Sequence, residues 1–352
     1  MVNLEEVARL AGVSRSTVSR VVNDDRRVSD TVRSRVQDII RQHDYHPNAA
    51  ARSLASRRTR ILGLLIPEAV SAVFSDPFFP RLIQGAVEAC NSADYNLLML
   101  MDSGNESDVS DRLYRRVIRG HHLDGMLIVS SVVDDPMIKQ LLASDFPFVL
   151  VGRHPRYQEI SFVDVDNRAA AQSLVAHLLG HGYEQIAMIG GMRNMIATID
   201  RYGGYVTALQ EAGLMPDPQL IAYGDFDEQG GYRAMQQLLP YQPRAVFVAS
   251  DMMAFGALQA LRDAGIQVPE EIAVVGFDGV AQGAVSQPPL STISQPISDL
   301  GREAIRVLLD AIERPDRSPV HRFLPTQLTI RRSCGCPETS GPHPLGGDRR
   351  AP

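Results

Sequence analysis

The sequence predicts an α + α/β fold, with a small head of three helices followed by a large body built on two doubly wound parallel sheets. The chain has 352 residues, which is longer than one ordinary domain. Up to residue 43, apolar side chains recur three or four positions apart, as they do along one face of a helix. From Ile61 onward, short apolar runs alternate with amphipathic helical patterns, and this alternation indicates parallel sheets covered by helices on both faces.

The composition is that of a globular protein from a reducing compartment. Apolar residues make up 44% of the chain, enough to form cores and too many for a disordered chain. The three cysteines, Cys90, Cys334 and Cys336, are too few for a disulfide framework. Glu5 and Glu6 lie where the apolar stretch of a signal peptide would begin, and every apolar run is too short to span a membrane. We therefore expect a cytoplasmic protein.

Charge is distributed unevenly along the chain. The net charge is −6, yet residues 1–60 contain 12 Arg, no Lys and 7 acidic residues. The head thus carries +5 and the remaining chain −11. A basic head on an acidic body favours contact of the head alone with the phosphates of a nucleic acid, although an excess of this size also fits chance.

The first two predicted helices have clear start and stop signals. Asn3 and Glu6 form a capping-box pattern, and Gly12 can adopt the left-handed conformation that ends a helix. Ser14 then caps a second helix over 15–23. Two short helices joined by a glycine turn form the helix-turn-helix pattern.

In a helix-turn-helix unit, the early residues of the second helix meet base edges in the major groove of DNA. Here these residues are Arg15, Ser16, Thr17, Ser19 and Arg20. Arginine can read guanine through two hydrogen bonds, while hydroxyl groups suit phosphates or mixed contacts. The same residues also fit the solvated face of an ordinary helical hairpin, so the spacing alone leaves both interpretations open.

A third helix over 30–43 begins after Ser29, and its apolar residues close the core of the head. The following segment, 48–56, is rich in alanine and prone to form a helix of about two turns, which is marginal alone in water. From its residues alone, this segment also fits an ordinary interdomain linker.

Two stretches of the sequence, LEEVARLAGVSRSTVSRVVND and YHPNAAARSLASRRTRILGLLIP, resemble the head and hinge of the lactose-repressor/purine-repressor family of bacterial transcription regulators. The resemblance extends to about Arg332. It implies a sequence-specific regulator, which we interpret as a repressor, whose affinity for operator DNA is switched by a small-molecule effector. The residues that it places on DNA are Arg15, Ser16, Thr17, Ser19, Arg20, Asn23, Ser29, Asn48, Arg52, Leu54, Arg57 and Arg58.

The resemblance also gives the hinge segment a role in DNA binding. It implies that two hinge helices pair in the minor groove and insert Leu54 between base steps. One head offers little surface and a short hinge helix needs a partner, so we expect a homodimer on a near-palindromic operator. The tail after Arg332 is rich in Pro and Gly and lacks the leucine heptads of a tetramerising helix.

The body is predicted to contain two successive sets of strands and helices. The first set of strands covers 61–66, 96–101, 125–129 and 148–151, and the second covers 185–189, 220–223, 245–249 and 273–275. The predicted helices are 81–89, 168–179, 204–211, 230–239 and 253–264. Two sets indicate two subdomains, with a ligand pocket between them at the carboxyl ends of the strands.

The resemblance implies a body of periplasmic-binding-protein type, in which the chain crosses three times between the subdomains. We expect these crossings near 162–164, 292–295 and 324–326. The predicted domains are a head over 1–46, a hinge and linker over 47–60, a body over 61–333 and a flexible tail over 334–352. Within the body, the N-subdomain covers about 61–162 and 296–325, and the C-subdomain covers about 163–293 and 326–333.

The candidate effector-binding residues match family positions that contact effectors, and they are Phe78, Phe79, Arg153, Asp166, Arg201, Phe226, Ser250, Asp251, Asp278 and Gln295. Carboxylates and guanidinium groups bind paired hydroxyls, and an aromatic side chain can stack on a ring. Asp166 and Asp251 fit simple helix caps equally well. Phe78 and Phe79 also fit an ordinary core.

Departures from the family pattern bear on the chemical class of the effector. Met195 and Ala197 stand where purine-binding members have Arg and Thr, and Ser250 stands where many sugar-binding members have Asn. We therefore expect a carbohydrate, with a purine- or nucleobase-responsive, co-repressed regulator as the alternative. A non-regulatory solute-binding protein would share the body but would need an export signal.

Motifs of enzymes and metal sites are missing from the sequence. It contains no Gly-x-Ser-x-Gly, P-loop or His-Glu-x-x-His pattern, so an enzyme is not expected. The pair Cys334 and Cys336 offers too few ligands for a structural zinc site, and we interpret it as inert. The sequence therefore predicts no cofactor and no bound metal.

Overall fold

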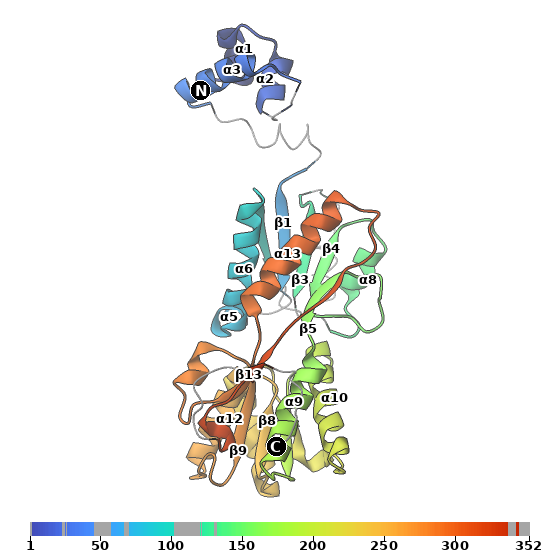
Figure 1. Cartoon of the computed structure of the whole chain (residues 1–352), viewed down its shortest axis with the longest axis vertical. Helices are drawn as coiled ribbons and strands as arrows, with labels where there is room; N and C mark the ends of the chain where they lie inside the picture. Colours follow the sequence, from blue (N-terminus) through green and yellow to red (C-terminus); the bar gives the residue numbers. More distant parts are fainter. Residues whose placement is uncertain are drawn as a thin grey trace, which may run out of the picture. The chain divides into compact units, whose positions relative to one another are not determined.

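The structure is a computed structural model that describes residues 2–22, 25, 27–45, 58–66, 70–101, 120, 122–129, 132–336 and 343–344. The chain forms two compact units, a head that extends to Arg60 and includes 121–124, and a body that holds the remainder. Figure 1 shows the helices and strands of each unit. In the part of the chain described, no helix is long and apolar enough to cross a membrane.

The head contains three helices, α1 (Leu4–Ala11), α2 (Arg15–Val22) and α3 (Asp30–Gln42). The Asn3 side chain accepts a hydrogen bond from the Glu6 amide at 2.9 Å, and Gly12 ends α1 with φ of 62°. One side chain from each helix is fully buried at the centre of the head: Val7, Val18 and Val36. The predicted three-helix head is thus confirmed.

The N-subdomain is built on a parallel sheet of six strands in the order β11-β5-β4-β3-β1-β2. These strands are β1 (Ile61–Ile66), β2 (Asn96–Met101), β3 (Gly125–Val129), β4 (Phe148–Val151), β5 (Phe162–Val165) and β11 (His321–Leu324). Its helices are α5 (Val70–Ser75), α6 (Phe78–Ser92), α8 (Pro136–Leu142) and α13 (Ile297–Glu313). Strand β3 is buried along its whole length, and its sequence is accordingly a continuous apolar run.

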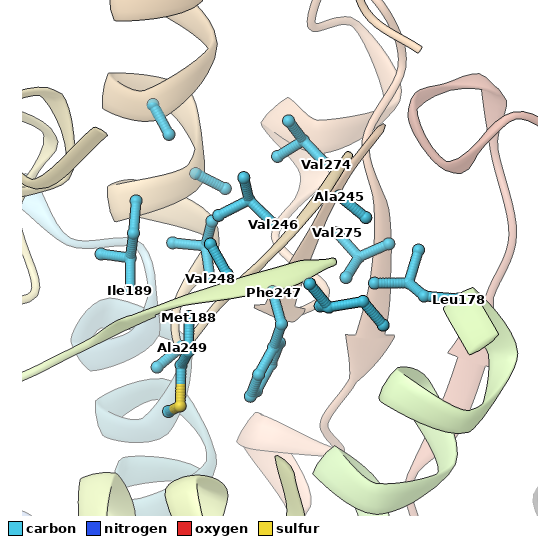
Figure 2. Packing of buried hydrophobic residues seen from close by; sticks show 14 of the residues in the cluster. Leu178, Met188, Ile189, Ala245, Val246, Phe247, Val248, Ala249, Val274 and Val275 are labelled. Carbon is cyan, nitrogen blue, oxygen red and sulfur yellow. The ribbon is translucent and has the colours of Figure 1, made fainter. Parts of the chain in front are cut away.

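The C-subdomain has a seven-stranded sheet in the order β13-β12-β10-β9-β8-β6-β7. Its strands are β6 (Ile186–Gly190), β7 (Ile221–Tyr223), β8 (Ala245–Val248), β9 (Ala273–Asp278), β10 (Ser291–Ser294), β12 (Gln327–Thr329) and β13 (His343–Pro344), the last two antiparallel. The helices α9 (Asn167–Gly180), α10 (Ile196–Glu211), α11 (Glu228–Leu238) and α12 (Asp251–Asp263) cover it. Figure 2 shows how its buried core packs around Val246, Phe247 and Val275.

The chain passes between the two sheets at three places. It leaves the first sheet after β5 and enters α9, returns after β10 into α13, and changes sheet again between β11 and β12. The predicted two-subdomain α/β body is confirmed, and the first four predicted strands have the bounds of β1 to β4.

The two longest described helices differ most from the sequence prediction, and the short helices α5 and α8 were not predicted either. Helix α10 begins at Ile196 instead of 204, and α13 was not predicted as a helix. Both contain glycine, which weakens a helical pattern. The glycines serve packing, since a Cβ at Gly204 would overlap the Arg168 carbonyl oxygen of α9, and one at Gly301 would overlap the Leu82 carbonyl oxygen of α6. Figure 1 shows α13 lying against α6.

Candidate functional site

A cavity of about 510 Å³ lies between the two subdomains. Its wall combines side chains from the start of α6, the start of α10, the loop between β7 and α11, and the end of β9. These residues are Ser75, Asp76, Phe78, Phe79, Met195, Ala197, Arg201, Asp225, Phe226, Asp227, Glu228, Gln229, Met252 and Asp278. A smaller cavity of about 70 Å³ continues from it toward Arg153 and Gln295. The volume of the larger cavity lies within the range of about 300–1,000 Å³ that is usual for small-molecule sites.

Three phenylalanines give the larger cavity apolar faces. Phe78 and Phe79 come from the N-subdomain, with their rings edge to face and their centroids 5.5 Å apart. Phe226 comes from the C-subdomain and has φ of 62°, a left-handed conformation that costs an aromatic residue free energy. Its ring occupies the space that a Cβ at Gly191 would need. Strain of this kind gathers at functional sites, and the sequence also predicts that Phe226 contacts the effector.

Arg201 is the buried cation of the cavity wall. Its Nε donates a hydrogen bond of 2.9 Å to Asn167 Oδ1, and its Nη1 donates to the Ala249 carbonyl oxygen. The guanidinium carbon lies 3.8 Å from the centre of the Phe277 ring. Burial lowers the pKa of Arg201, and the surrounding carboxyls oppose this shift. The guanidinium is therefore fixed in place before any ligand arrives.

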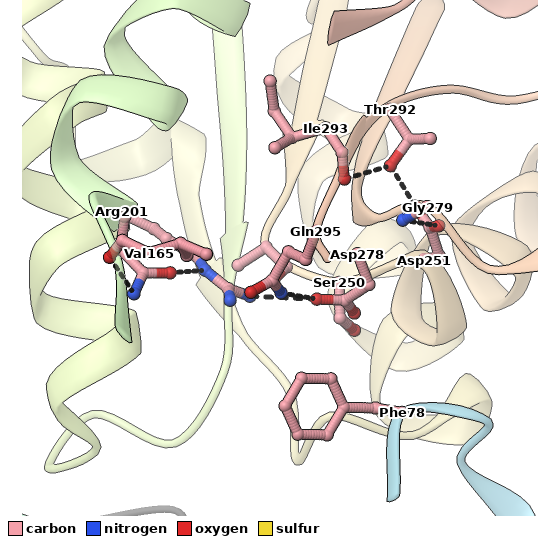
Figure 3. Close-up of polar contacts among 12 residues, drawn as sticks. Phe78, Val165, Arg201, Ser250, Asp251, Asp278, Gly279, Thr292, Ile293 and Gln295 are labelled. Carbon is pink, nitrogen blue, oxygen red and sulfur yellow. Dashed lines mark hydrogen bonds and ion pairs between the residues drawn. The ribbon is translucent and has the colours of Figure 1, made fainter. Parts of the chain in front are cut away.

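Asp278 ends β9 and faces Arg201, with 3.7 Å between Asp278 Oδ1 and Arg201 Nη1. Gln295 Nε2 donates a hydrogen bond of 2.7 Å to the same carboxylate oxygen. Figure 3 shows Arg201, Gln295 and Asp278 in one row, which the Phe78 ring approaches from the N-subdomain. Burial raises the pKa of Asp278 well above its usual range, and its φ of 125° is a second strained backbone on the cavity wall.

Three of the residues predicted to bind the effector do not line either cavity, and they are Asp166, Ser250 and Asp251. Asp166 is exposed and caps α9 by accepting from the Ala169 amide at 2.9 Å. Ser250 caps α12 by accepting from the Met253 amide at 3.2 Å. A strand that leads into a helix needs such a cap, so the same residue types occur at a strand end for either purpose.

Asp251 has a different structural role. It is fully buried and accepts hydrogen bonds from the amides of Gly279 and Val280 at 2.8 and 2.9 Å and from Thr292 Oγ1 at 2.6 Å. Burial raises its pKa to about 6, against these hydrogen bonds. Asp251 thus holds the loop that follows Asp278, and it positions the cavity wall without reaching the cavity.

Arg153 lines the smaller cavity and joins the two subdomains. Its Nε donates a hydrogen bond of 2.8 Å to Asp200 Oδ2 on α10, and its Nη2 pairs with the other carboxylate oxygen. A second contact between the subdomains runs from Arg81 Nη1 to the Gly279 carbonyl oxygen at 3.2 Å. Polar contacts of this kind can form in one relative arrangement of the subdomains and break in another.

Sequence reasoning left out several residues of the cavity wall. Asp227, Glu228 and Gln229 directly follow Phe226, and Met252 follows Asp251. The Asp227 carboxylate also caps α11 by accepting from the Gly230 amide at 2.6 Å, so its pattern resembles an ordinary helix start. Their position after a strand in a doubly wound sheet is the signal that could have identified them.

The buried carboxyl of Asp164 leads to a prediction on pH. Burial raises its pKa to about 7, above the value of about 3.9 in an unfolded chain. A carboxyl group whose pKa is raised by folding contributes its full stabilisation at a pH below its pKa in the unfolded chain. This contribution is lost as the pH rises through about 7, the pKa in the folded protein. We expect Asp164→Asn to reduce the fall in unfolding free energy between pH 5 and pH 7 by up to about 1.4 kcal/mol per pH unit. Denaturant titrations at several pH values measure this, with the exposed Asp166→Asn as control, and an unchanged pH profile would contradict the assignment.

The second functional surface is the helix-turn-helix of the head. Arg15, Ser16 and Arg20 on α2 are exposed, and Thr17 and Ser19 are partly exposed. The Ser14 hydroxyl accepts from the Thr17 amide at 3.1 Å, so it caps α2 as predicted. Ser29 is exposed before α3, and Arg58 is partly buried. The other predicted DNA contacts, which are Asn23, Asn48, Arg52, Leu54 and Arg57, lie outside the described residues together with the hinge helix.

Comparisons with known proteins match both units of the chain. Residues 3–48 match the model of the bacterial regulatory proteins of the lacI family, and residues 175–334 match a periplasmic binding protein-like domain. The HTH-type transcriptional regulator CelR of Thermobifida fusca is 37% identical over 334 residues, which cover 94% of this chain and 97% of CelR. The ribose operon repressor of Escherichia coli K12 is 35% identical over 320 residues, which cover 90% of this chain and 94% of that repressor.

A solved structure agrees with these relatives along nearly the whole chain. It is the complex of the transcriptional regulator CelR with cellobiose, which has a TM-score of 0.75 and 35% sequence identity. The alignment covers 94% of this chain and 99% of that structure's chain. The similarity thus includes the head and both subdomains.

Proposed function

This chain belongs to the lacI family of bacterial regulatory proteins, and from that premise we propose that it is a transcription repressor whose operator affinity is switched by a neutral carbohydrate. The observation that carries the proposal is the cavity between the subdomains, where a strained Phe226 and a strained Asp278 lie on the same wall as Arg201. Phe226 would stack on the sugar ring, while the charged side chains would bind its hydroxyls.

The charge of the cavity wall favours a neutral ligand. The wall carries five carboxyl groups, on Asp76, Asp225, Asp227, Glu228 and Asp278, and one guanidinium group. Carboxylates repel phosphate and other anions but accept hydrogen bonds from sugar hydroxyls. A neutral sugar therefore suits this wall better than a sugar phosphate or a nucleotide.

A purine effector is the second candidate, and the residues of the cavity wall do not favour it. Met195 and Ala197, which stand where purine-binding members have Arg and Thr, both line the cavity. Neither side chain can donate a hydrogen bond to a base edge. The complex of CelR with cellobiose, from a chain 35% identical to this one, further supports a carbohydrate.

The ligand class can be tested by thermal shift of the full-length protein. We expect a neutral mono- or disaccharide, with cellobiose and ribose among the first to be screened, to raise the melting temperature by mass action. Hypoxanthine, guanine and the sugar phosphates serve as comparison ligands and should leave it unchanged. Tight binding of a nucleobase in place of any sugar would overturn the carbohydrate assignment.

The head is proposed to read the operator through α2. We expect Arg20→Ala to weaken binding to the best operator by about 1–3 kcal/mol and to relax the preference at one base pair. Arg58→Ala, which removes a phosphate contact, should weaken all DNA sequences alike. Measuring affinity for operator variants at fixed salt separates the two effects. If Arg20→Ala reduced the affinity for all sequences equally, Arg20 would not be a base-reading residue.

Assembly as a homodimer is also part of the proposal. A two-fold dimer would place two heads on a near-palindromic operator and pair two hinge helices around Leu54. We expect sedimentation to give a dimer that binds one operator. We also expect Leu54→Ala to reduce DNA bending without changing effector binding. A monomer bound with nanomolar affinity to a single half-site would contradict this arrangement.

We further infer that the protein acts in the cytoplasm and has no enzymatic activity. Its relatives are transcriptional regulators, and its buried polar groups hold the cavity wall in place through mutual hydrogen bonds. Among the described residues, those that line the two cavities include no cysteine or histidine that could form the hydrogen-bonded nucleophile and base of covalent catalysis.

A further inference from the structure

Four metal-ligating side chains meet at the far end of α9, away from the ligand cavity. His177 lies in the last turn of α9 and His181 is its C-cap residue, so the two histidines are four positions apart on one face of the helix. Cys334 and Cys336 follow β12, after the last crossing between sheets. Cys334 is separated from His177 by 157 residues in the sequence.

Three of the four side chains have ligand atoms close enough together to hold one metal ion, and Cys334 approaches this group through His177. The Nε2 of His177, the Nε2 of His181 and the Sγ of Cys336 all lie within 4.8 Å of one another. His181 Nε2 is 3.0 Å from Cys336 Sγ, and His177 Nε2 is 3.7 Å from Cys336 Sγ and 3.4 Å from Cys334 Sγ. Around a tetrahedral Zn²⁺ with Zn–N of about 2.0–2.1 Å and Zn–S of about 2.3 Å, neighbouring ligand atoms lie about 3.3–3.8 Å apart.

The backbone between the two cysteines is shaped for this approach. Gly335 has φ of 91°, a conformation that L side chains rarely adopt, and a Cβ there would lie 2.9 Å from the Tyr183 hydroxyl oxygen. The Ser291 hydroxyl donates a hydrogen bond of 3.1 Å to Cys334 Sγ, the kind of outer contact that supports a thiolate ligand. Glycine at 335 thus lets both thiols face the two histidines.

We propose that His177, His181, Cys334 and Cys336 bind one structural zinc ion, which ties the end of the body to α9. The sequence alone predicts an inert cysteine pair, because two cysteines supply only two metal ligands. Nothing in the sequence links 177 and 181 to the Cys-Gly-Cys segment. The fold supplies the two imidazoles that complete a Cys₂His₂ set, and four protein ligands leave no open position for catalysis. Binding Zn²⁺ displaces the protons of both thiols to solvent and needs no oxidant or reductant.

The direct test is the metal content of full-length protein made without a histidine tag and purified under reducing conditions. We expect about one zinc ion per chain by elemental analysis. Removal by a chelator should lower the melting temperature by a few degrees, and added Zn²⁺ should restore it. Co²⁺ in place of zinc should give the intense visible absorption of a tetrahedral site together with thiolate-to-metal charge transfer.

Variants assign the ligands. Cys336→Ser and His181→Ala change side chains that are not fully buried, so they should fold and lose both the zinc and the Co²⁺ spectrum. Cys90→Ala is the matched control, since this thiol is buried on α6 in the other subdomain and should leave both unchanged.

Either of two results would overturn the proposal. One is wild-type protein that contains no zinc after purification and gives no tetrahedral Co²⁺ spectrum on titration. The other is a Cys334–Cys336 disulfide, recovered after digestion without reductant from protein that was never exposed to oxidant.

Discussion

Replacing Asp278 with asparagine is expected to weaken effector binding by about tenfold to a hundredfold. The carboxylate is fixed by Gln295 and Arg201 on the cavity wall, and a hydrogen bond to a charged group is worth about 1.5–3 kcal/mol. Asparagine has nearly the same shape, so the loss reports the charge and not a new cavity. Calorimetry with the sugar identified by thermal shift measures the change.

The control for this prediction is Asp166→Asn. Asp166 is also a predicted effector residue, but the structure places it as an exposed cap of α9, and asparagine caps helices as well as aspartate does. We expect wild-type affinity for this variant. Equal affinity for the sugar in the Asp278→Asn and wild-type proteins would place the ligand elsewhere.

The largest loss of stability is expected for Arg201→Met. The substitution leaves the Asp278 carboxyl and the Asn167 side chain without their buried partner. Breaking a buried ion pair by removing one member costs about 3–5 kcal/mol, which for a chain of this size lowers the melting temperature on the order of 10 °C. The loss should be smaller at acidic pH, because burial already raises the pKa of Asp278 and a protonated carboxyl needs no cation.

Arg233→Met provides the comparison for Arg201→Met. Arg233 pairs with Asp225 at 3.4 Å on an exposed part of the wall, and such pairs contribute about 1 kcal/mol or less. Thermal unfolding of both variants at pH 5 and pH 8 gives the two differences. A loss for Arg201→Met no greater than that for Arg233→Met would show that the buried guanidinium does not hold the wall together.

The strands were the most predictable part of the fold. A strand covered on both faces, such as β3 or β8, has a continuous apolar sequence, and its short length favours a strand over a helix. The early turns of α10 and the whole of α13 were harder to predict, because glycines that let helices approach closely also weaken the helical pattern.

The residues of the candidate site also differed in how well the sequence predicted them. Phe226, Arg201 and Asp278 were predicted and line the cavity, whereas Asp166 and Ser250 cap helices. Aspartate and serine at a strand end serve either purpose, and only the direction of the side chain separates them. Clusters that join distant segments, such as His177 with Cys334, leave no local pattern for a sequence prediction to use.

The cavity can act as a switch only through a difference in affinity between two arrangements of the body. A sugar that contacts Phe78 on one subdomain and Asp278 on the other binds best at one spacing of the two walls. The Arg153–Asp200 and Arg81–Gly279 contacts also depend on that spacing. By linkage, a ligand that favours one arrangement must weaken or strengthen DNA binding by the same free energy with which DNA alters ligand binding.

The most direct test is the dissociation constant for an operator, selected by the full-length protein from random DNA, measured at fixed salt with and without saturating sugar. For the wild-type protein we expect the sugar to raise this constant about 5- to 150-fold, the usual range of an allosteric coupling. Asp278→Asn should bind the operator normally without sugar and respond only at much higher sugar concentrations. A sugar that binds the cavity by calorimetry but leaves the operator dissociation constant unchanged, or lowers it, would contradict an inducible repressor.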